Sequence, residues 1–452
     1  MVKTQNNKRV YLIGIGGIGM SSLARYYLSE GFMVSGSDIV SSPITEELEG
    51  LGVKIFCGPH KASHIPRGSG FIVHTAALRK DNLELKEGRK RKYVIRTYAE
   101  ALGELTKNYF TIAVAGAHGK STTTAMVAKV LIEGGLDPTV IIGTRLKDSS
   151  GADGKKDTNF RKGNSKYLIV EADEYAGSFL NYHPDIAVLT NIDEEHLDFY
   201  KTKARIVSAF KKFLTGSKPG AVFVLNNDNQ DVLKLGLLLS KLKRFSGRFR
   251  WYSLRNSAVE DIKYRLQVPG IHNVSNALAA YCVGQTLKIP NEKILKALSE
   301  YGGVWRRFEY KGTLNGAKIF DDYAHHPTEI KATLEAARER YPKHRIWCVF
   351  QPHQQDRLSR LFERFVPAFD CANELVLLDP YEVPGREKPR SRRVNASSFR
   401  LAAAVDARLK NNVYYISYSS QIPEFLARYV GMHDIVIMMG AGDIWKLTGK
   451  LV

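Results

Sequence analysis

The stretch Phe110–Thr124, FTIAVAGAHGKSTTT, contains the features that decide the fold of this chain. Its apolar half, Phe110–Ala115, predicts a buried strand, Gly116–Lys120 predicts a tight loop, and Ser121–Gly134 has the pattern of a helix. A strand that enters a helix through such a loop presents backbone N–H groups to phosphate, while the lysine and the next hydroxyl bind phosphate charge and Mg²⁺. Two residues separate the glycines where a Walker sequence has four, but the chemical groups of an ATP-binding loop are present.

A second strand–loop–helix unit lies about a hundred residues earlier. The sequence predicts a strand at Arg9–Ile15, a loop at Gly14–Gly19 with the sequence GIGGIG, and a helix at Met20–Glu30. A further predicted strand, Met33–Ser37, ends at Asp38, where dinucleotide-binding proteins place the carboxylate that binds a ribose. The motif fits a nicotinamide cofactor, and it equally fits a nucleotide-sugar, because both contain a diphosphate.

Strand-like apolar runs alternate with helical patterns along most of the chain, which predicts an α/β fold with mainly parallel sheets. Because a nicotinamide dehydrogenase needs no ATP-type loop, the two loops indicate one nucleotide that supplies energy and another that carries the substrate. The other predicted strands are Gly70–Ala76, Tyr93–Arg96, Tyr167–Val170, Ile186–Thr190, Ala221–Leu225, Lys318–Asp321, Ile346–Phe350, Glu374–Leu378, Val413–Ile416 and Asp434–Met439.

Length and polar segments predict the domain boundaries. The chain has 452 residues, which corresponds to about three domains at roughly 150 residues each. Lys147–Ser165 and Gly302–Gly312 are expected to be loops or linkers, and a new strand–helix series follows the second of them. We therefore predict three domains, at residues 1–107, 108–304 and 305–452.

The composition excludes several classes of protein. Hydrophobic residues make up 44% of the chain and charged residues 25%, which is typical of a globular protein and excludes wholesale disorder. Since no run of about 18 apolar residues occurs, we expect no membrane-spanning helix and no membrane partner. The four cysteines lie far apart without metal-ligand spacing, so they are expected to be buried thiols in a reducing cytoplasm.

The charge is the unusual bulk property. Lys+Arg 66 against Asp+Glu 46 gives a formal net charge of +20, which is compatible with nucleic-acid binding. The basic residues gather at Arg79–Arg96, Lys241–Arg250 and Arg386–Arg393, but none of these clusters has a nucleic-acid-binding motif. We interpret them as solvated surfaces and predict no nucleic-acid partner.

Acidic and histidine residues follow two predicted strands of the second unit. Glu171–Glu174, with the sequence EADE, follows one strand, and Thr190–Asp198, which contains His196, follows the next. The carboxyl ends of parallel strands form the ligand crevice of an open sheet, and carboxylate oxygens suit Mg²⁺. The sequence therefore predicts magnesium binding beside the second loop.

These motifs, with others along the chain, resemble those of the Mur ligases. The resemblance implies a cytoplasmic, ATP-dependent ligase of peptidoglycan precursor synthesis that joins an amino acid to a UDP-muramyl carboxylate through an acyl phosphate. It implies an N-terminal Rossmann-like UDP-binding domain, a central P-loop ATPase-like domain and a C-terminal Rossmann-like domain. The markers GIGGIGM and DDYAHHPTEI favour the member that joins L-alanine to UDP-N-acetylmuramate. The further motifs are SGSD, EADE, TNIDEEHLDFY, GIHNVSNALAA, RRFEYKG, FQPH and GAGDI.

The resemblance also implies roles for individual residues. Lys120 would bind the ATP phosphates, Ser121 and Glu171 the first Mg²⁺, and His196 the second. The expected UDP-sugar-binding residues are Gly14, Gly16, Gly17, Gly19, Asp38, His74 and Thr75. The expected ATP-binding residues are Gly116, Ala117, His118, Gly119, Lys120, Ser121, Thr122, His272, Asn273 and Asn276. The expected amino-acid-binding residues are Arg307, His325, His326, His353 and Arg357. The expected catalytic residues are Lys120, His196, His325, His326 and Arg357.

Several alternatives remain open at this stage. His325 or His326 would take the proton of the incoming amine, or would instead bind the amino-acid carboxylate or pack in a loop. Gln354 stands where the family has an arginine, and Arg360 could compensate. The enzyme could add a recycled peptide or another amino acid, and an NAD-dependent dehydrogenase is the alternative from a different class. We expect a monomer or weak homodimer.

Overall fold

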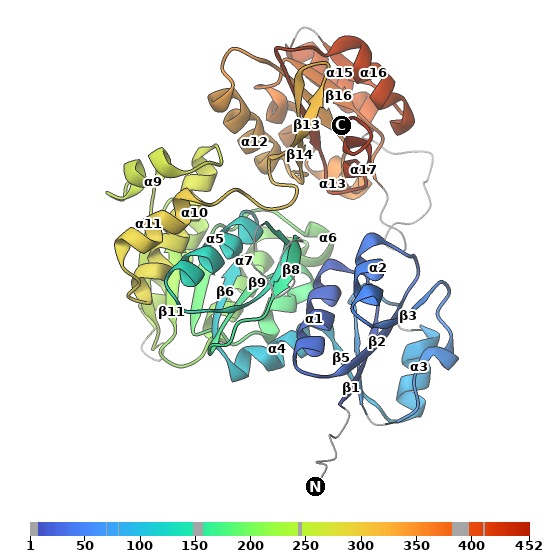
Figure 1. Ribbon diagram of the computed structural model, residues 1–452. Coiled ribbons are helices and arrows are strands. Elements are labelled where there is room, and N and C mark those ends of the chain that lie inside the picture. The colour runs from blue at the N-terminus through green and yellow to red at the C-terminus, as the bar shows by residue number, and fades with distance from the viewer. Residues whose placement is uncertain are drawn as a thin grey trace. The chain divides into compact units, whose positions relative to one another are not determined.

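The computed structural model describes residues 8–68, 70–79, 81–147, 157–242, 246–381, 397–409 and 412–452. These residues form three sheets with helices packed on them, which is the α/β class that the sequence predicts (Figure 1). The chain divides into two units, Met1–Ile262 with Asn276–Ser299, and Lys263–Ser275 with Glu300–Val452. The first unit contains two of the sheets, and the second unit contains the third.

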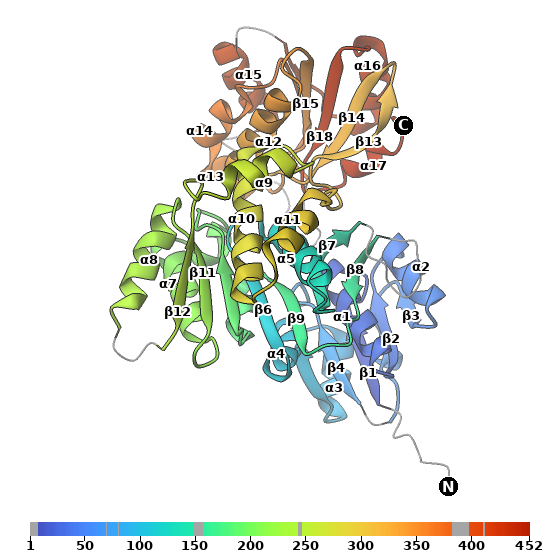
Figure 2. The ribbon, with the colours of Figure 1, turned by 60° about the vertical axis from the view of Figure 1, so that its left-hand side comes forward.

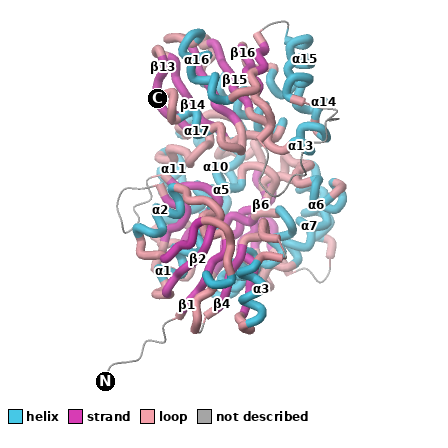
Figure 3. The backbone as a smooth tube through the Cα atoms, turned by 90° about the vertical axis from the view of Figure 1, so that its right-hand side faces the viewer, coloured by secondary structure: helices cyan, strands magenta, loops and turns pink. Residues whose placement is uncertain are grey.

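The first sheet has five parallel strands in the order β3-β2-β1-β4-β5. Figure 3 labels β1, β2 and β4 among them. Since the order reverses at β1, the carboxyl ends of β1 and β4 form the edge where such sheets bind ligands. The strands are β1 (Arg9–Ile13), β2 (Met33–Asp38), β3 (Lys54–Cys57), β4 (Phe71–His74) and β5 (Val94–Thr97), and the helices are α1 (Ile18–Ser29), α2 (Pro43–Gly50), η1 (Ala62–His64), α3 (Leu83–Lys90) and α4 (Tyr98–Asn108).

The second sheet has seven strands in the order β12-β11-β10-β6-β9-β7-β8, and β8 alone is antiparallel to its neighbour. Strands β6, β10 and β11 are almost continuously apolar because helices cover both faces of this sheet (Figure 2). The strands are β6 (Phe110–Ala115), β7 (Thr139–Leu146), β8 (Thr158–Arg161), β9 (Tyr167–Ala172), β10 (Ile186–Leu189), β11 (Val222–Asn226) and β12 (Arg248–Tyr252). The helices are α5 (Lys120–Glu133), η2 (Tyr175–Asn181), α6 (Leu197–Tyr200), α7 (Lys203–Thr215), α8 (Gln230–Ser240), α9 (Val259–Arg265), α10 (Ile271–Thr286) and α11 (Asn291–Ser299).

The third sheet has six strands in the order β13-β14-β18-β15-β16-β17, and only the β13–β14 pair is antiparallel. Two hydrophobic clusters, one on each face, pack helices against it. The strands are β13 (Glu309–Leu314), β14 (Ala317–Asp322), β15 (Arg345–Phe350), β16 (Glu374–Leu377), β17 (Val413–Tyr415) and β18 (Asp434–Met439). The helices are α12 (Pro327–Arg340), α13 (Gln355–Arg360), α14 (Phe362–Phe365), η3 (Val366–Phe369), α15 (Ser398–Leu409), η4 (Ser419–Gln421), α16 (Ile422–Tyr429) and α17 (Trp445–Thr448).

Every predicted strand is present to within a few residues, but five strands were not predicted: β3, β7, β8, β12 and β13. The expectation of a continuous loop at Lys147–Ser165 is wrong, because β8 occupies part of it and pairs with β7. The expected linker at Gly302–Gly312 likewise contains the start of β13. Four of them, β3, β8, β12 and β13, lie at the edges of their sheets, where pairing with a neighbour rather than a local apolar pattern makes them strands. The fifth, β7, lies inside its sheet, and its apolar run was a signal that could have predicted it.

The cysteines, the lengths of the helices and the basic clusters bear on the remaining expectations from the sequence. All four cysteines are free, but the expectation that all are buried is wrong, since Cys57 is exposed and Cys371 is half-buried. Among the described residues, no helix combines the length and apolar character that crossing a membrane requires. The basic cluster Arg386–Arg393 and parts of the other two clusters lie outside the described residues.

Candidate active site

The first glycine loop is held at the carboxyl ends of β1 and β2. The Gly14 N–H donates to the Ser37 carbonyl over 2.8 Å, and the Gly16 N–H donates to Asp38 Oδ2 over 2.8 Å. Gly14 has φ +80°, and a Cβ there would lie 2.6 Å from Thr75 Cγ2, so only glycine fits. Asp38 therefore fixes the loop by accepting this hydrogen bond.

The end of β4 meets the same loop. The Thr75 N–H donates to the Ile13 carbonyl over 3.1 Å, and His74 Nδ1 lies 2.9 Å from the Thr75 carbonyl oxygen. Gly17 is the N-cap of α1, and a Cβ at Gly19 would lie 2.9 Å from Tyr98 Cζ. The fold thus brings the expected UDP-sugar residues to one edge, with Gly19 serving the packing of α1 on Tyr98.

Neighbouring atoms pack closely against both glycines of the second loop. Gly116 has φ +138°, and a Cβ there would lie 2.0 Å from Thr190 Oγ1. Gly119 has φ +80°, and its Cβ would lie 2.4 Å from Asn276 Oδ1, which also accepts a hydrogen bond from Thr123 Oγ1 over 3.2 Å. These contacts require glycine at both positions and place Asn276 against the loop.

His118 and the residues after β10 fasten the loop. The His118 carbonyl accepts hydrogen bonds from Thr190 Oγ1 over 2.7 Å and from Asn191 Nδ2 over 3.0 Å. The His118 N–H donates to Asn191 Oδ1 over 2.9 Å, and its Nε2 lies 3.2 Å from Asp193 Oδ2. His118 therefore helps to shape the loop through both its backbone and its ring.

Lys120 begins α5 and turns its ammonium group into the loop. Its Nζ donates to the carbonyls of Gly116 and Ala117 over 2.7 and 3.1 Å, and lies 2.9 Å from Glu174 Oε2. Burial disfavours the charged form, but the nearby carboxylates, Glu174 foremost, outweigh it and raise the pKa of Lys120. The side chain is therefore a permanent cation at the end of the loop.

Two groups of oxygen-rich side chains lie beside Lys120. Ser121 Oγ donates to Glu171 Oε1 over 2.9 Å, which brings together the residues expected to bind the first Mg²⁺. Asp173, Glu174 and His196 place their ligand atoms within 4.8 Å of one another, and His196 Nε2 lies 3.4 Å from Glu174 Oε1. The carboxylate and hydroxyl oxygens of these two groups fit Mg²⁺, which prefers oxygen ligands.

His196 is tied electrostatically to Glu174. Burial disfavours the charged ring, but the hydrogen bond and charge of Glu174 outweigh it and raise the pKa of His196. The sequence-based assignment did not include Glu174 or Asp173 as ligands. The acidic run EADE after β9 was the available signal, but only the fold shows which of its carboxylates face His196.

The expected adenine residues are divided between the two units. Asn276 belongs to the first unit, whereas His272 and Asn273 belong to the second. Burial, together with the positive charge of Arg307, lowers the pKa of His272 to about 4, so this ring is neutral near pH 7. Asn273 Nδ2 donates to the Pro269 carbonyl over 2.7 Å and thereby fixes the turn before α10.

His325 and His326 have different environments at the start of α12. His326 is fully buried, and its Nδ1 accepts a hydrogen bond from the Thr328 N–H over 3.3 Å as the N-cap of the helix. His325 is partly exposed, and its Nδ1 lies 3.0 Å from the Tyr323 carbonyl and 3.2 Å from Glu329 Oε2. Since both neighbours of Nδ1 are acceptors, the neutral His325 ring carries its proton there and its lone pair on Nε2.

The other expected amino-acid-binding residues lie near His325 in the second unit. The ring of His353 lies 5.7 Å from that of His325, and Arg357 Nη1 lies 3.2 Å from His353 Nδ1. Arg307 lies over the ring of Tyr323 at 5.2 Å. Tyr323 thus contacts Arg307 and His325 and orders this cluster. The sequence-based assignment did not include Tyr323, although its place inside DDYAHHPTEI was an available signal.

Gln354 begins α13 as its N-cap residue, with φ +67°. Arg360 on the same helix is an exposed side chain whose Nε donates to Asp356 Oδ2 over 2.7 Å. This ion pair occupies Arg360, so the structure gives no support to the expectation that it replaces the missing arginine at Gln354.

Three protein-family models match almost the whole chain. The model described as "Mur ligase family, catalytic domain" matches residues 9–110. "Mur ligase middle domain" matches residues 114–284, and "Mur ligase, glutamate ligase domain" matches residues 306–442. The matched segments follow one another in the order of the three sheets.

Relatives of known name match over similar lengths. The chain is 40% identical to the UDP-N-acetylmuramate–L-alanine ligase of Geobacter sp. (strain M21), over 97% of this chain and 96% of that protein. It is 39% identical to the protein of the same name from Acetivibrio thermocellus, over 97% and 94%. The solved UDP-N-acetylmuramate–alanine ligase of Thermotoga maritima has a TM-score of 0.78 and 26% identity, with 98% of each chain covered. The chain therefore belongs to the Mur ligase family.

Proposed function

We propose that this protein is an ATP-dependent ligase that joins L-alanine to the carboxylate of UDP-N-acetylmuramate in peptidoglycan precursor synthesis. The observation that carries the proposal is the identity of about 40% to ligases of that name over nearly the whole chain. The two glycine loops support it, because one suits a nucleotide-sugar diphosphate and the other suits ATP. A dehydrogenase would leave Lys120 and the carboxylates around it without a purpose.

We assign one substrate to the segment around each of the three sheets, in the order of the chain. We assign UDP-sugar binding to residues 1–107, ATP binding to residues 108–304 and amino-acid binding to residues 305–452. The reaction belongs in the cytoplasm, where ATP and the UDP-sugar are found, and the protein acts as a monomer or weak homodimer without nucleic-acid or membrane partners.

The first chemical step activates the sugar carboxylate. A carboxylate oxygen attacks the γ-phosphorus of ATP, the bond to the β,γ-bridging oxygen breaks, and an acyl phosphate and ADP result. Because both reactants are anions, the permanent positive charge of Lys120 stabilises the transition state, and the loop amides align the phosphates. Mg²⁺ held by Ser121 and Glu171, and by His196 with Glu174, would neutralise further phosphate charge.

The second step forms the amide. The ammonium group of L-alanine must lose a proton before its nitrogen attacks the acyl phosphate, and His325 is the better of the two candidate bases. Its neutral form has a lone pair on Nε2, whereas the buried His326 ring uses Nδ1 to cap α12. Arg307 and Arg357 suit the carboxylate of the amino acid, and loss of phosphate from the tetrahedral intermediate completes the reaction.

Phosphate release tests the proposal. The full chain is mixed with ATP, Mg²⁺ and UDP-N-acetylmuramate, and L-alanine, glycine, L-serine and a tripeptide are added separately. We expect release that needs the UDP-sugar and is fastest with L-alanine. Preference for the tripeptide would indicate a peptide-recycling ligase, release without sugar or amine would contradict a ligase altogether, and NAD(H) binding would favour a dehydrogenase.

A further inference from the structure

The antiparallel strands β7 and β8 contact residues near both glycine loops, although neither strand contains a residue assigned above to binding or catalysis. Helix α1, which starts at the end of the first glycine loop, packs against both strands (Figure 2). Three sets of polar contacts connect this strand pair to its surroundings, and all of them lie within the first unit.

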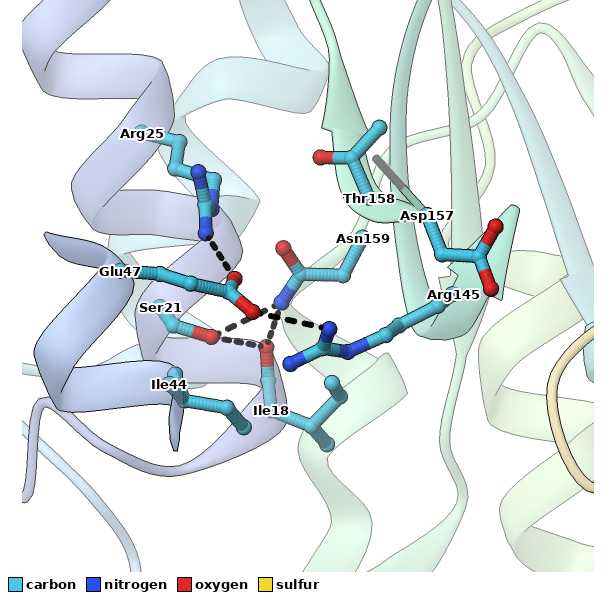
Figure 4. Close-up of a pocket in the computed structure, with 9 residues that line it drawn as sticks. All are labelled: Ile18, Ser21, Arg25, Ile44, Glu47, Arg145, Asp157, Thr158 and Asn159. Atoms are coloured by element: carbon cyan, nitrogen blue, oxygen red, sulfur yellow. Dashed lines mark hydrogen bonds and ion pairs between the residues drawn. The ribbon is translucent and has the colours of Figure 1, made fainter. Parts of the chain in front are cut away.

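The first contact fixes the start of α1. Asn159 on β8 is 4% exposed, and its Nδ2 donates to the Ile18 carbonyl over 2.6 Å and to Ser21 Oγ over 2.8 Å (Figure 4). Ile18 is the first residue of α1 and directly follows Gly17. Since a buried amide needs its partners, Asn159 holds the helix end that faces the expected diphosphate.

The second contact is an ion triad around Glu47. Glu47 on α2 accepts from Arg25 on α1 over 2.8 Å and, through its other oxygen, from Arg145 on β7 over 2.9 Å. Figure 4 shows Arg25 and Arg145 approaching Glu47 from two different elements. The side chains are only 16–24% exposed, so these charge-assisted bonds hold three elements together more firmly than surface ion pairs do.

The third contact reaches the metal residues. The Gly143 N–H on β7 donates to Glu171 Oε2 over 2.9 Å, while Glu171 Oε1 accepts from Ser121. A Cβ at Gly143 would lie 3.0 Å from Glu171 Oε2, so the strand runs directly against this carboxylate. The same two strands therefore contact the start of α1 and the residue expected to bind the first Mg²⁺.

We propose that the β7–β8 strand pair couples UDP-sugar binding to nucleotide binding, with Asn159, Glu47 and Arg145 as positioning residues. The inference rests on the proposed function, because it takes the first loop as the UDP-sugar site and the second as the ATP site. Coupling of this kind is reciprocal, so each ligand tightens the binding of the other by the same factor.

Calorimetric titration of the full chain with UDP-N-acetylmuramate, with and without saturating Mg²⁺ and ADP, measures the coupling without turnover. We expect the nucleotide to tighten UDP-sugar binding in the wild-type protein by about fivefold or more. Asn159→Ala and Glu47→Gln should reduce this factor to less than about twofold, while unliganded melting temperatures show that the variants fold. Arg145→Lys, which keeps the charge, should retain part of the coupling.

Two matched variants separate coupling from simple loss of structure or charge. Arg161→Ala removes an ion pair from β8 to Asp137, at 2.8 Å, without touching α1, and Glu49→Gln removes an exposed charge from α2. Both should keep the wild-type factor. Three outcomes would overturn the inference: equal losses of coupling in these controls, unchanged coupling in Asn159→Ala and Glu47→Gln, or no coupling in the wild type. A wild-type chain that binds neither ligand would contradict the proposed function itself.

Discussion

Lys120 illustrates how one residue combines local and distant contacts. Its position after Gly119 follows from the sequence, but its charge is stabilised by Glu174, which lies 54 residues further along the chain. In the proposed ATP complex, the ammonium group exchanges the Glu174 carboxylate for phosphate oxygens. Because both partners are anionic, the exchange keeps the cation paired throughout.

Replacing Lys120 tests this role. Lys120→Ala should lower kcat by about 10²–10³-fold or more, because the ammonium group that lies in the loop is then lost. Lys129→Ala, a change of the same kind on the same helix, should leave kcat within about twofold. Coupled measurement of ADP release gives both values, and substantial turnover by Lys120→Ala would remove the loop from the mechanism.

The proposed role of His196 in binding the second Mg²⁺ predicts a change in the magnesium requirement. His196→Ala should raise the Mg²⁺ concentration for half-maximal activity by about 10–100-fold, because a ligand or its partner is lost beside Glu174. A titration of initial rate against Mg²⁺ measures the shift, with His183→Ala as a control. An unchanged titration curve would mean that His196 is structural.

His272 makes stability depend on pH. Its pKa of about 4 in the folded protein lies below the ordinary value of about 6.5, so between these values the unfolded chain binds more protons. Stability should therefore fall as pH falls from 6.5 to 4, by roughly 3 kcal/mol at most from this group. Denaturant unfolding of His272→Gln should show a shallower loss over this window. A wild-type and variant pair with parallel pH profiles would contradict the assignment.

At the scale of elements, both proposed nucleotide sites consist of a strand, a glycine loop and a helix at the point where strand order reverses. Helix α5 starts at Lys120, directly after Gly119. Strands β9 and β10 flank β6, so the loop lies beside the carboxylates that follow β9 and the hydroxyl and amide groups that follow β10. This arrangement leaves no room for a side chain at Gly116.

Gly116→Ala should therefore weaken ATP binding by more than about tenfold. The added Cβ would overlap Thr190 Oγ1 at 2.0 Å, and φ +138° is a region that alanine avoids. Gly135→Ala is the matched control, because Gly135 also has a positive φ, +78°, but no heavy atom lies within 4 Å of its Cβ position. That variant should cost about 1 kcal/mol of stability and leave ATP binding unchanged. Fluorescent-nucleotide titration and thermal melting distinguish the two effects.

For the whole molecule, the net charge of +20 is the property that motifs do not explain. ATP and the UDP-sugar are polyanions, whereas L-alanine has no net charge at neutral pH. Positive potential around the protein should speed the capture of the first two only.

Raising the salt concentration from about 20 to 200 mM should lower kcat/KM for UDP-N-acetylmuramate several-fold, because salt screens the attraction. The KM for L-alanine provides an internal control and should stay nearly constant. Equal salt responses for both substrates would show that the charge does not act in substrate capture.

Much of the fold and part of the site could be predicted because the deciding features are contiguous. The buried central strands of each sheet are apolar runs, so β1, β6, β10, β15 and β18 are recognisable without a structure. Edge strands such as β8 and β12 are polar or charged, and only their hydrogen-bonded neighbours make them strands. The same limit applies to Glu174, since three carboxylates of one acidic run are equivalent until the sheet orients them.

The sequence by itself determined the two glycine loops and the α/β class. Each of these depends on neighbouring residues: a strand, a residue that tolerates positive φ, and the first turn of a helix. Only the tertiary structure decided that Glu174 pairs with Lys120, that His326 caps α12 while His325 keeps a lone pair on Nε2, and that Asn159 holds the start of α1. Except for the histidine pair, these contacts join residues that are far apart in the chain, and strand order and register bring them together.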